Sequence, residues 1–271
     1  MSAVARQHSS ASPSRFLRTV VPPLVFFALL VLGWELYVRA RGLADYVLPA
    51  PSQVLRALVD MAPDLGADIR ATVTEASVGL VLAAVSGAVF AVVIASWPVA
   101  RRTVYPLLVV SQTIPAIVLA PILIVWLGFG LLPKIVVVAL VGFFPVVVST
   151  VDGLVATDRE QLDLVRSFGA DRWQRLRLVQ MPSALPSFFA GVKIAATYAV
   201  VGAVIGEWMG ASEGLGLVMT RAYRAFRTDR VFAAIVVVAL VSLLLFAIVS
   251  VVARLATPWT AATTSDGSEH T

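Results

Sequence analysis

The run Gly210–Gly214, with Ser212 at its centre, matches the G-x-S-x-G pattern of a hydrolase nucleophile elbow. In such an elbow, a strand-to-helix turn presents the serine to a histidine that acts as general base. The only histidines, His8 and His270, lie in polar tails at the two ends of the chain. We therefore expect no catalytic residue in this chain, and we interpret the glycines as a turn that follows an apolar segment.

Other common chemistries lack the residues that they need. The chain has no cysteine, which excludes disulfides, thiolate metal sites and cysteine nucleophiles. The phosphate-binding pattern G-x-x-x-x-G-K-[ST] is absent, and the only lysines are Lys134 and Lys193. We expect this chain to bind no metal, cofactor or nucleotide of its own.

The composition is that of an integral membrane protein. Of the 271 residues, 59% are hydrophobic and 14% are charged, which is far more apolar than an ordinary globular domain. A hydrocarbon core of about 30 Å requires roughly 20 helical residues. Helices are expected because unsatisfied backbone groups are costly in lipid and strict strand alternation is absent. The sequence predicts an all-α integral membrane protein with six transmembrane helices, near residues 20–38, 72–96, 104–127, 134–151, 187–206 and 231–253.

The formal charge of +5 could suggest a nucleic acid partner. The basic residues, however, sit in short clusters between apolar spans, without a basic face or a docking motif. We therefore expect contact with membrane lipid and no nucleic acid. Six spans place both ends of the chain on one side, but the positive charges are divided too evenly to show which side that is.

The segments around the spans divide the chain further. Residues 1–19 are predicted to form a polar tail, and the apolar run 20–38 is longer than a typical signal-peptide core, which favours an uncleaved first transmembrane helix. Residues 39–71 are predicted to be an external loop with a short amphipathic helix at the membrane surface, for which Ser52 could be the N-cap. The remaining parts are a membrane core and a second polar tail, residues 72–256 and 257–271.

The third predicted span carries polar residues and helix breakers. Ser111, Gln112 and Thr113 lie in a row, and three prolines interrupt the helix pattern around them. Broken helices at membrane depth occur where neighbouring protein or a water-filled path satisfies the freed carbonyls. Two interpretations follow: a kinked packing helix whose hydroxyls bond to its own backbone, or a helix that lines a translocation path through Gln112 and Thr113.

Glu207 lies at the end of the fifth predicted span, and Thr197 and Tyr198 lie deeper in the same span. A carboxylate at the membrane interface is much cheaper than one at the bilayer centre. Glu207 is therefore either a residue of a gate or pathway, together with Thr197 and Tyr198, or a partner in an interfacial ion pair with Arg221 or Arg224.

A polar segment interrupts the membrane pattern between the fourth and fifth predicted spans. Apolar residues recur there every three positions, as on one face of a helix. Gly169 fits the left-handed position that ends this helix, Asp171 can cap a second helix, and Pro182 is expected to stop that helix. The result is a helical hairpin with an exposed turn, within residues 152–186.

The spacing in this hairpin resembles a pattern of importer-type ABC permeases, which is Glu-Ala-Ala, three residues, Gly, nine residues, Ile, one residue and Leu-Pro. The chain reads Asp163-Leu164-Val165, three residues, Gly169, nine residues, Val179-Gln180-Met181-Pro182. Glycine and proline match, and the acidic, apolar and β-branched classes are kept, whereas both alanines are replaced. The chain is similar, from about Pro49 onward, to permeases for nitrate, alkanesulfonates, taurine and thiamine-precursor pyrimidines, including the segments QTIPAIVLAPILIVWLGFG, FFPVVVSTVDGL and GEWMGASEGLG.

This resemblance implies a MetI-like permease bundle in the plasma membrane of a prokaryote, with both termini in the cytoplasm. It implies that the hairpin is a cytoplasmic coupling element for a separate ABC ATPase subunit, which holds ATP and Mg. An extracytoplasmic substrate-binding protein and a homodimer are implied as well. The residues expected to serve coupling are Asp163, Arg166, Gly169, Ala170, Asp171, Arg172, Trp173, Arg175 and Pro182.

The substrate implied by the resemblance is a small polar solute. The segment ATYAVVGAVIGEWMGASEGLG looks most like the members associated with thiamine-precursor pyrimidines, ahead of sulfonates, taurine or nitrate. The alternative is an ion-coupled secondary transporter, which would favour paired broken helices from an inverted repeat and ionisable residues near the midplane. Neither feature is clear in the sequence.

Overall fold

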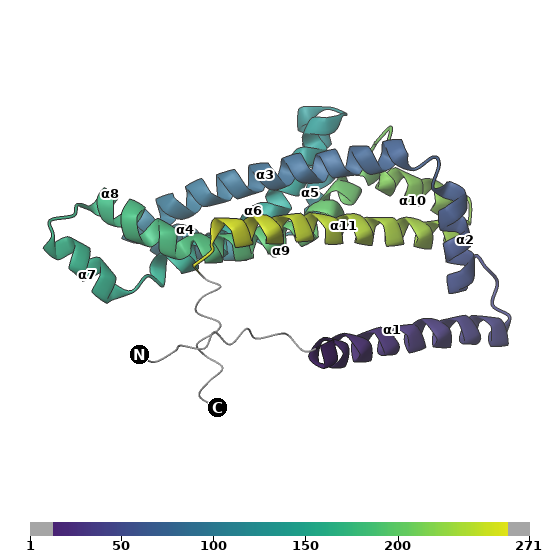
Figure 1. The fold of residues 1–271 in the computed structure, drawn as a ribbon. Helices are drawn as coiled ribbons and strands as arrows, with labels where there is room; N and C mark the ends of the chain where they lie inside the picture. The colour runs from purple at the N-terminus through teal and green to yellow at the C-terminus, as the bar shows by residue number, and fades with distance from the viewer. Residues whose placement is uncertain (1–12, 260–271) are drawn as a thin grey trace, which may run out of the picture.

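The structure, a computed structural model, describes residues 13–259. Every regular element in this range is helical, which confirms the predicted all-α fold (Figure 1). Five helices are long and apolar enough to cross a membrane, and a bent pair gives a sixth span if it is counted as one. Most of both predicted polar tails, with His8 and His270, lies outside the described residues. The elements are α1 (Pro13–Arg41), α2 (Pro51–Met61), α3 (Gly66–Ser96), α4 (Pro98–Ser111), α5 (Ala116–Leu127), α6 (Leu131–Val155), α7 (Arg159–Ser167), α8 (Arg172–Arg175), the π-helical turn η1 (Leu176–Gln180), α9 (Met181–Trp208), α10 (Leu215–Arg224) and α11 (Thr228–Ala256).

The helices are longer than the predicted spans. α1 begins at Pro13 and not at residue 20, so part of the predicted polar tail is helical, and α3 begins at Gly66 and not at residue 72. A hydropathy pattern ends where charges begin, whereas helical hydrogen bonding continues through charged residues such as Asp68 in the first turn of α3. The predicted external loop is correspondingly shorter.

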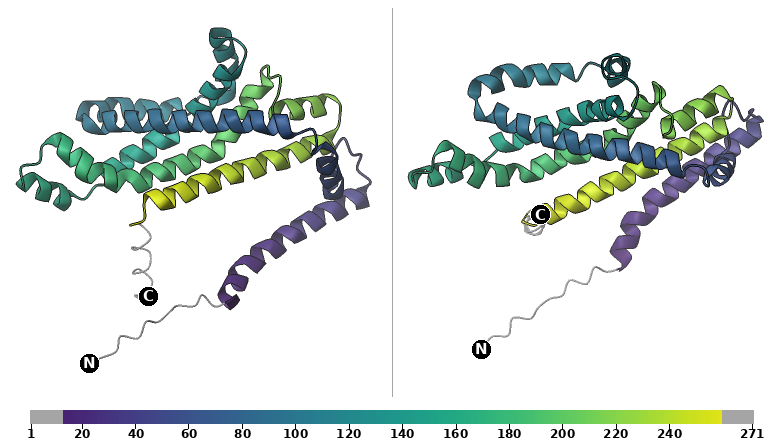
Figure 2. Two further views of the ribbon diagram at one scale, coloured as in Figure 1. Left: turned by 45° about the horizontal axis from the view of Figure 1, so that its top comes forward. Right: turned by 90° about the horizontal axis from the view of Figure 1, so that it is seen from above.

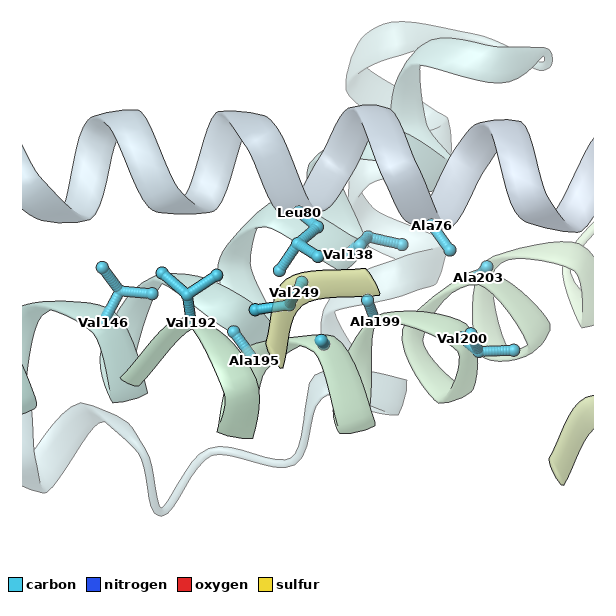
Figure 3. Close-up of a cluster of buried hydrophobic side chains, with 11 residues drawn as sticks. Ala76, Leu80, Val138, Val146, Val192, Ala195, Ala199, Val200, Ala203 and Val249 are labelled. Carbon is cyan, nitrogen blue, oxygen red and sulfur yellow. The ribbon is translucent and has the colours of Figure 1, made fainter. Parts of the chain in front are cut away.

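The core of the bundle is formed by α3, α6 and α9, and α11 packs against α9. Small side chains make this contact close: Ala195, Ala199 and Ala203 of α9 are fully buried against Val138 and Val146 of α6 (Figure 3). Lipid is as apolar as these side chains, so close packing of small residues, and not removal from water, holds such helices together.

The third predicted span is not one continuous or gently kinked helix. Its residues form α4 and α5, which meet at an angle of 96°. The break follows Ser111, and Gln112 and Thr113 lie in the turn, where the backbone N–H of Thr113 donates to the carbonyl of Val110. Pro115 precedes α5 in an extended conformation and has no N–H with which to continue the helix.

The N-cap of α2 is Ala50, so the prediction of Ser52 is wrong. Pro51 occupies the first helical position, which suits a residue without an N–H, so the helix begins one residue before Ser52. Gln53 accepts a hydrogen bond from the N–H of Ala50 at 2.7 Å. The N–H and hydroxyl of Ser52 donate instead to the carboxylate of Glu35, at 3.0 and 2.8 Å, and so join α2 to α1.

Helix α2 is packed onto one end of the bundle. Its buried residues Val54, Ala57 and Met61 belong to a cluster with Leu215 of α10 and Val237 of α11. We call this the α10 end of the bundle and the opposite end, which carries α7 and α8, the hairpin end. Most of α1 lies apart from the other long helices, and α1 meets the bundle through α2 and through Trp34, whose ring packs on Phe232 of α11 with 5.6 Å between the ring centroids (Figures 1 and 2).

Candidate functional site

Helix α7 ends in a tight turn at Gly169. The backbone of Gly169 has a φ of 85°, in the left-handed region that glycine adopts without steric cost. Its N–H donates to the carbonyl of Arg166 at 2.9 Å, and the N–H of Ala170 donates to the carbonyl of Val165 at 3.1 Å. This pair of bonds is a Schellman motif. The predicted left-handed glycine is confirmed.

The second helix of the hairpin begins at Asp171, as predicted. The carboxylate of Asp171 accepts a hydrogen bond from the N–H of Gln174 at 2.7 Å, and the side chain of Gln174 accepts one from the N–H of Asp171 at 2.8 Å. This reciprocal capping box satisfies two backbone donors at the start of the helix. The orientation of α8 is thereby fixed by residues of the turn itself.

The prediction that Pro182 stops this helix is wrong. α8 continues through η1 into α9, and the N–H of Met181 donates to the carbonyl of Leu176, five residues earlier. The ring of a proline inside an α-helix clashes with the carbonyl four residues before it, and the wider π-helical turn relieves this crowding. A helical run from Arg172 to Trp208 therefore joins the hairpin directly to the core of the bundle.

The turn of the hairpin carries large apolar side chains on its surface. Phe168 is 82% exposed and Trp173 is 63% exposed, although both stand in a strongly charged segment. An exposed apolar patch with a polar rim is typical of an interaction surface. The predicted residues from Asp163 to Arg175 all lie around the turn of this hairpin, whereas Pro182 lies at its far end, in the first turn of α9.

The five residues proposed for a pathway are not joined in one site. Gln112 and Thr113 are exposed in the turn between α4 and α5, and Thr197 and Tyr198 are exposed on α9. The hydroxyls of Thr113 and Thr197 donate to carbonyls of their own segments, at 2.8 and 3.1 Å. Glu207 differs from these four residues because it is 1% exposed.

Glu207 faces α3 and α10 at the α10 end of the bundle. Its carboxylate accepts hydrogen bonds from the hydroxyl of Thr72 at 2.6 Å and from the N–H of Gly216 at 2.5 Å. Within residues 13–259, no ion pair joins Glu207 to Arg221 or Arg224, so the predicted ion pair is wrong. The side chain turns inward because the start of α10 supplies backbone donors that sequence spacing does not reveal.

Three consecutive N–H groups at the start of α10 are held by side chains of other helices. Gly214 donates to Asp68 at 2.8 Å, Leu215 donates to the hydroxyl of Thr72 at 3.0 Å, and Gly216 donates to Glu207. The first N–H groups of a helix have no partner within it, and Gly214 has no side chain to serve as a cap. α10 is therefore capped by α3 and α9, which fixes its N-terminus to both.

Glycine is required where α10 begins. Gly214 has a φ of 133°, and a Cβ at this position would overlap the carboxyl group of Glu207. The loop before it starts at Gly210, with a φ of 138°, and Ser212 is exposed within the loop. No strand precedes Ser212 in the described chain, so the G-x-S-x-G match is a glycine turn and has no elbow geometry.

Sequence reasoning missed a buried ion pair between α3 and α6. Lys134 Nζ lies 2.6 Å from Glu75 Oε1, and the two side chains are 11% and 2% exposed. Lys134 packs on Gly206, next to Glu207, so all three ionisable groups lie at the α10 end. The sequence did show a charged residue in each of two apolar spans, and because such residues are rare in membranes and usually paired, this could have indicated the ion pair. Among residues 13–259, no three acidic or histidine side chains gather as metal ligands would.

Comparison with known proteins identifies the family. Residues 79–259 match the family of binding-protein-dependent transport system inner membrane components. The chain is 40% identical over 205 residues to the formylaminopyrimidine transport permease protein ThiX of Halalkalibacterium halodurans, which covers 75% of this chain and 82% of that protein. It is 27% identical over 212 residues to the taurine transport system permease protein TauC of Escherichia coli, a match that covers 76% of this chain and 77% of that protein.

The fold is similar to that of a known transporter. The methionine ABC transporter MetNI, in an inward-facing conformation, contains a chain that superposes with a TM-score of 0.62 at 21% sequence identity, covering 70% of this chain and 94% of that one. MetI-like permeases are multi-pass membrane proteins that work with an ATPase and a substrate-binding protein and are not enzymes themselves. The chain therefore belongs to the family of binding-protein-dependent transport system inner membrane components and is the permease subunit of an ABC importer.

Proposed function

We propose that the hairpin at residues 152–186 is the element through which the ATPase subunit drives this permease. The observation that carries this proposal is the helical run from Arg172 to Trp208, which links an exposed turn to the most deeply packed helix of the core. A helix transmits displacement along its axis, so closure of two ATPase subunits can rock α9 against α3 and α6.

The residues at the turn have separate tasks in this proposal. Phe168 and Trp173 supply apolar contact, and Gly169 with Ala170 keeps the turn narrow enough to enter a groove on the ATPase. Asp171 fixes the direction of the second helix through its capping box. The charged residues Asp163, Arg166, Arg172 and Arg175 are available for complementary charges on the partner, and Pro182 marks the passage into α9.

Substitution of Gly169 tests the coupling role. A Cβ at this position meets nothing within 4 Å, so a substitution acts through the backbone alone. Valine disfavours a φ of 85°, whereas asparagine tolerates it. We expect Gly169→Val to abolish transport-coupled ATP hydrolysis while membrane insertion continues, and Gly169→Asn to retain most of the activity. Normal coupled hydrolysis in the valine variant, measured in proteoliposomes with the ATPase, would contradict the proposal.

The assembly and orientation follow from the same proposal. The hairpin end faces the cytoplasm, with both chain termini on that side, and ATP and Mg are bound by the partner ATPase. The α10 end then faces outward, toward the substrate-binding protein. One chain offers one hairpin for two ATPase subunits, so two identical copies around a shared axis are the simplest assembly.

We propose a thiamine-precursor pyrimidine as the transported solute, by likeness to the formylaminopyrimidine permease, which is more similar to this chain than the taurine permease. Gln112, Thr113, Thr197 and Tyr198 are the exposed polar residues that could line its path. Calorimetry with the binding protein of the same transport system, titrated with formylaminopyrimidine, taurine and an alkanesulfonate, tests this assignment. Binding of a sulfonate without binding of the pyrimidine would refute it.

A further inference from the structure

Three ionisable side chains from different helices lie together inside the α10 end of the bundle. They are Glu75 of α3, Lys134 of α6 and Glu207 of α9, and all three residues are buried. Lys134 joins the two acidic residues, because its ammonium group pairs with Glu75 and its stem packs on Gly206 beside Glu207. Buried charges are costly unless they are compensated, so the charges of this cluster have to balance.

The charges of this cluster do not cancel when all three groups are ionised. Lys134 supplies one positive charge against two carboxylates, and neither carboxylate has a second cation as a partner in the part of the chain that the structure describes. The start of α10 carries a partial positive charge, which offsets some of the charge on Glu207. Asp68, the other acidic side chain at the start of α10, adds to the negative side. The cluster therefore has an excess of negative charge.

One oxygen of the cluster has no hydrogen-bond donor. Both oxygens of Glu207 accept hydrogen bonds, from Thr72 and Gly216. Oε1 of Glu75 accepts a hydrogen bond from Lys134. Oε2 of Glu75 is buried and has no hydrogen-bond partner among the described residues. Buried polar atoms are nearly always hydrogen-bonded, so this oxygen marks the place where the cluster requires a donor.

The oxygen without a donor belongs to a carboxyl group that faces Glu207. Thr72 and Glu75 are three residues apart on α3, so both side chains lie on the face of α3 that meets Glu207. The carboxyl groups of Glu75 and Glu207 lie within hydrogen-bonding reach of each other. An ionised carboxylate has only acceptor atoms, so a hydrogen bond between these two groups requires that one of them carries a proton.

We propose that Glu75 and Glu207 form a proton-binding site in which the two carboxyl groups share one proton. This proton removes the excess negative charge, and it also gives Oε2 of Glu75 the hydrogen bond that this oxygen lacks. Two carboxyl groups in contact away from water hold a proton between them, because like charges repel strongly where the dielectric constant is low. The site is independent of the coupling role, and in the proposed orientation it lies at the outer end of the bundle.

The shared proton connects the cap of α10 with the buried ion pair. Glu207 holds the N–H of Gly216, and Glu75 holds Lys134, so a hydrogen bond between the two carboxyl groups completes one network. This network runs from α6 through α3 and α9 to the start of α10. The proton thus allows three helices of the core to close around their ionisable groups.

Infrared spectroscopy detects this proton directly, because the C=O stretching band of a protonated carboxyl group is separate from the bands of a carboxylate. The purified full chain is measured in nanodiscs at neutral pH without the ATPase, so the outcome is separate from that of the coupling test. We expect one protonated carboxyl band, which shifts after exchange into D₂O. Glu75→Gln and Glu207→Gln should each abolish this band, because either change leaves a single carboxylate to balance Lys134.

Glu35→Gln is the matched control. Glu35 pairs with Arg39 and accepts two hydrogen bonds from Ser52, so its carboxylate already has its donors. Its replacement should leave the protonated carboxyl band unchanged. Absence of the band from the unmodified protein would overturn the proposal, and so would its survival in Glu75→Gln or in Glu207→Gln, since the proton would then belong to one carboxyl group alone.

A sodium ion is the competing ligand for this site. Sodium would balance the same negative charge but would leave both carboxyl groups ionised. We expect the same band in sodium chloride and in choline chloride at equal concentration and pH. A band that weakens as sodium replaces choline would assign the site to the metal cation and overturn the shared proton.

Discussion

Replacement of Glu207 by alanine should destabilise the protein by removing the cap of α10. The N–H of Gly216 would lose its acceptor in a buried position, which costs about 1–3 kcal/mol. Loss of the hydrogen bond from the hydroxyl of Thr72 should cost less free energy, because this hydroxyl can still donate to the carbonyl of Asp68 at 3.1 Å. Removal of the buried side chain adds a cavity, so we expect a total of roughly 2–4 kcal/mol.

Replacement of Glu207 by glutamine is the matched control. Glutamine keeps the shape and one acceptor oxygen for Gly216, and its amide can donate to the hydroxyl of Thr72, so the loss should stay below about 1 kcal/mol. A membrane core of this size should shift its apparent melting temperature by about 2–4 °C per kcal/mol. We therefore expect a decrease of roughly 5–15 °C for Glu207→Ala and no more than about 4 °C for Glu207→Gln.

Thermal unfolding of the purified permease, followed by tryptophan fluorescence in one detergent, provides these values, and transport in proteoliposomes provides the activity. The reasoning requires Glu207→Gln to keep both stability and transport. Equal melting temperatures for the alanine variant and the unmodified protein would refute the capping role. A stable glutamine variant without transport would show instead that the negative charge is needed in the pathway.

Three further outcomes follow from the α10 end of the bundle. Glu75→Leu and Lys134→Met should each lower stability by about 3–5 kcal/mol, because each leaves a buried charge without its partner. The double variant should recover most of this loss. Thermal unfolding of all three variants checks this, because two independent losses would add in the double variant. Gly214→Ala should destabilise α10 through overlap with Glu207, and a melting temperature unchanged in this variant would contradict the packing. Ser212→Ala should leave the transport rate unchanged, since this serine is exposed in a turn. A lower transport rate in this variant would indicate that Ser212 has a chemical role.

The sequence by itself determined the membrane class, the helical fold and the hairpin. Hydropathy over a span depends only on neighbouring residues, and lipid permits few backbone structures, so the spans could be located without a structure. The turn of the hairpin is local in the same way, because Gly169 and Asp171 make their hydrogen bonds within a few residues of their own positions. The spacing of these residues also carried the resemblance that the family match confirmed.

Only the tertiary structure decided how the helices face one another. Thr72 and Glu207 are separated by 135 residues, and Glu75 and Lys134 by 59, so their pairing depends on the rotation of packed helices that hydropathy does not report. The local patterns also misjudged the backbone at two sets of prolines. They showed a break in the third span but not its bend of 96° before α5, and they predicted a helix end at Pro182, where the π-helical turn lets the helix continue. A residue's type fixes which contacts it needs, while packing decides which distant residue supplies them.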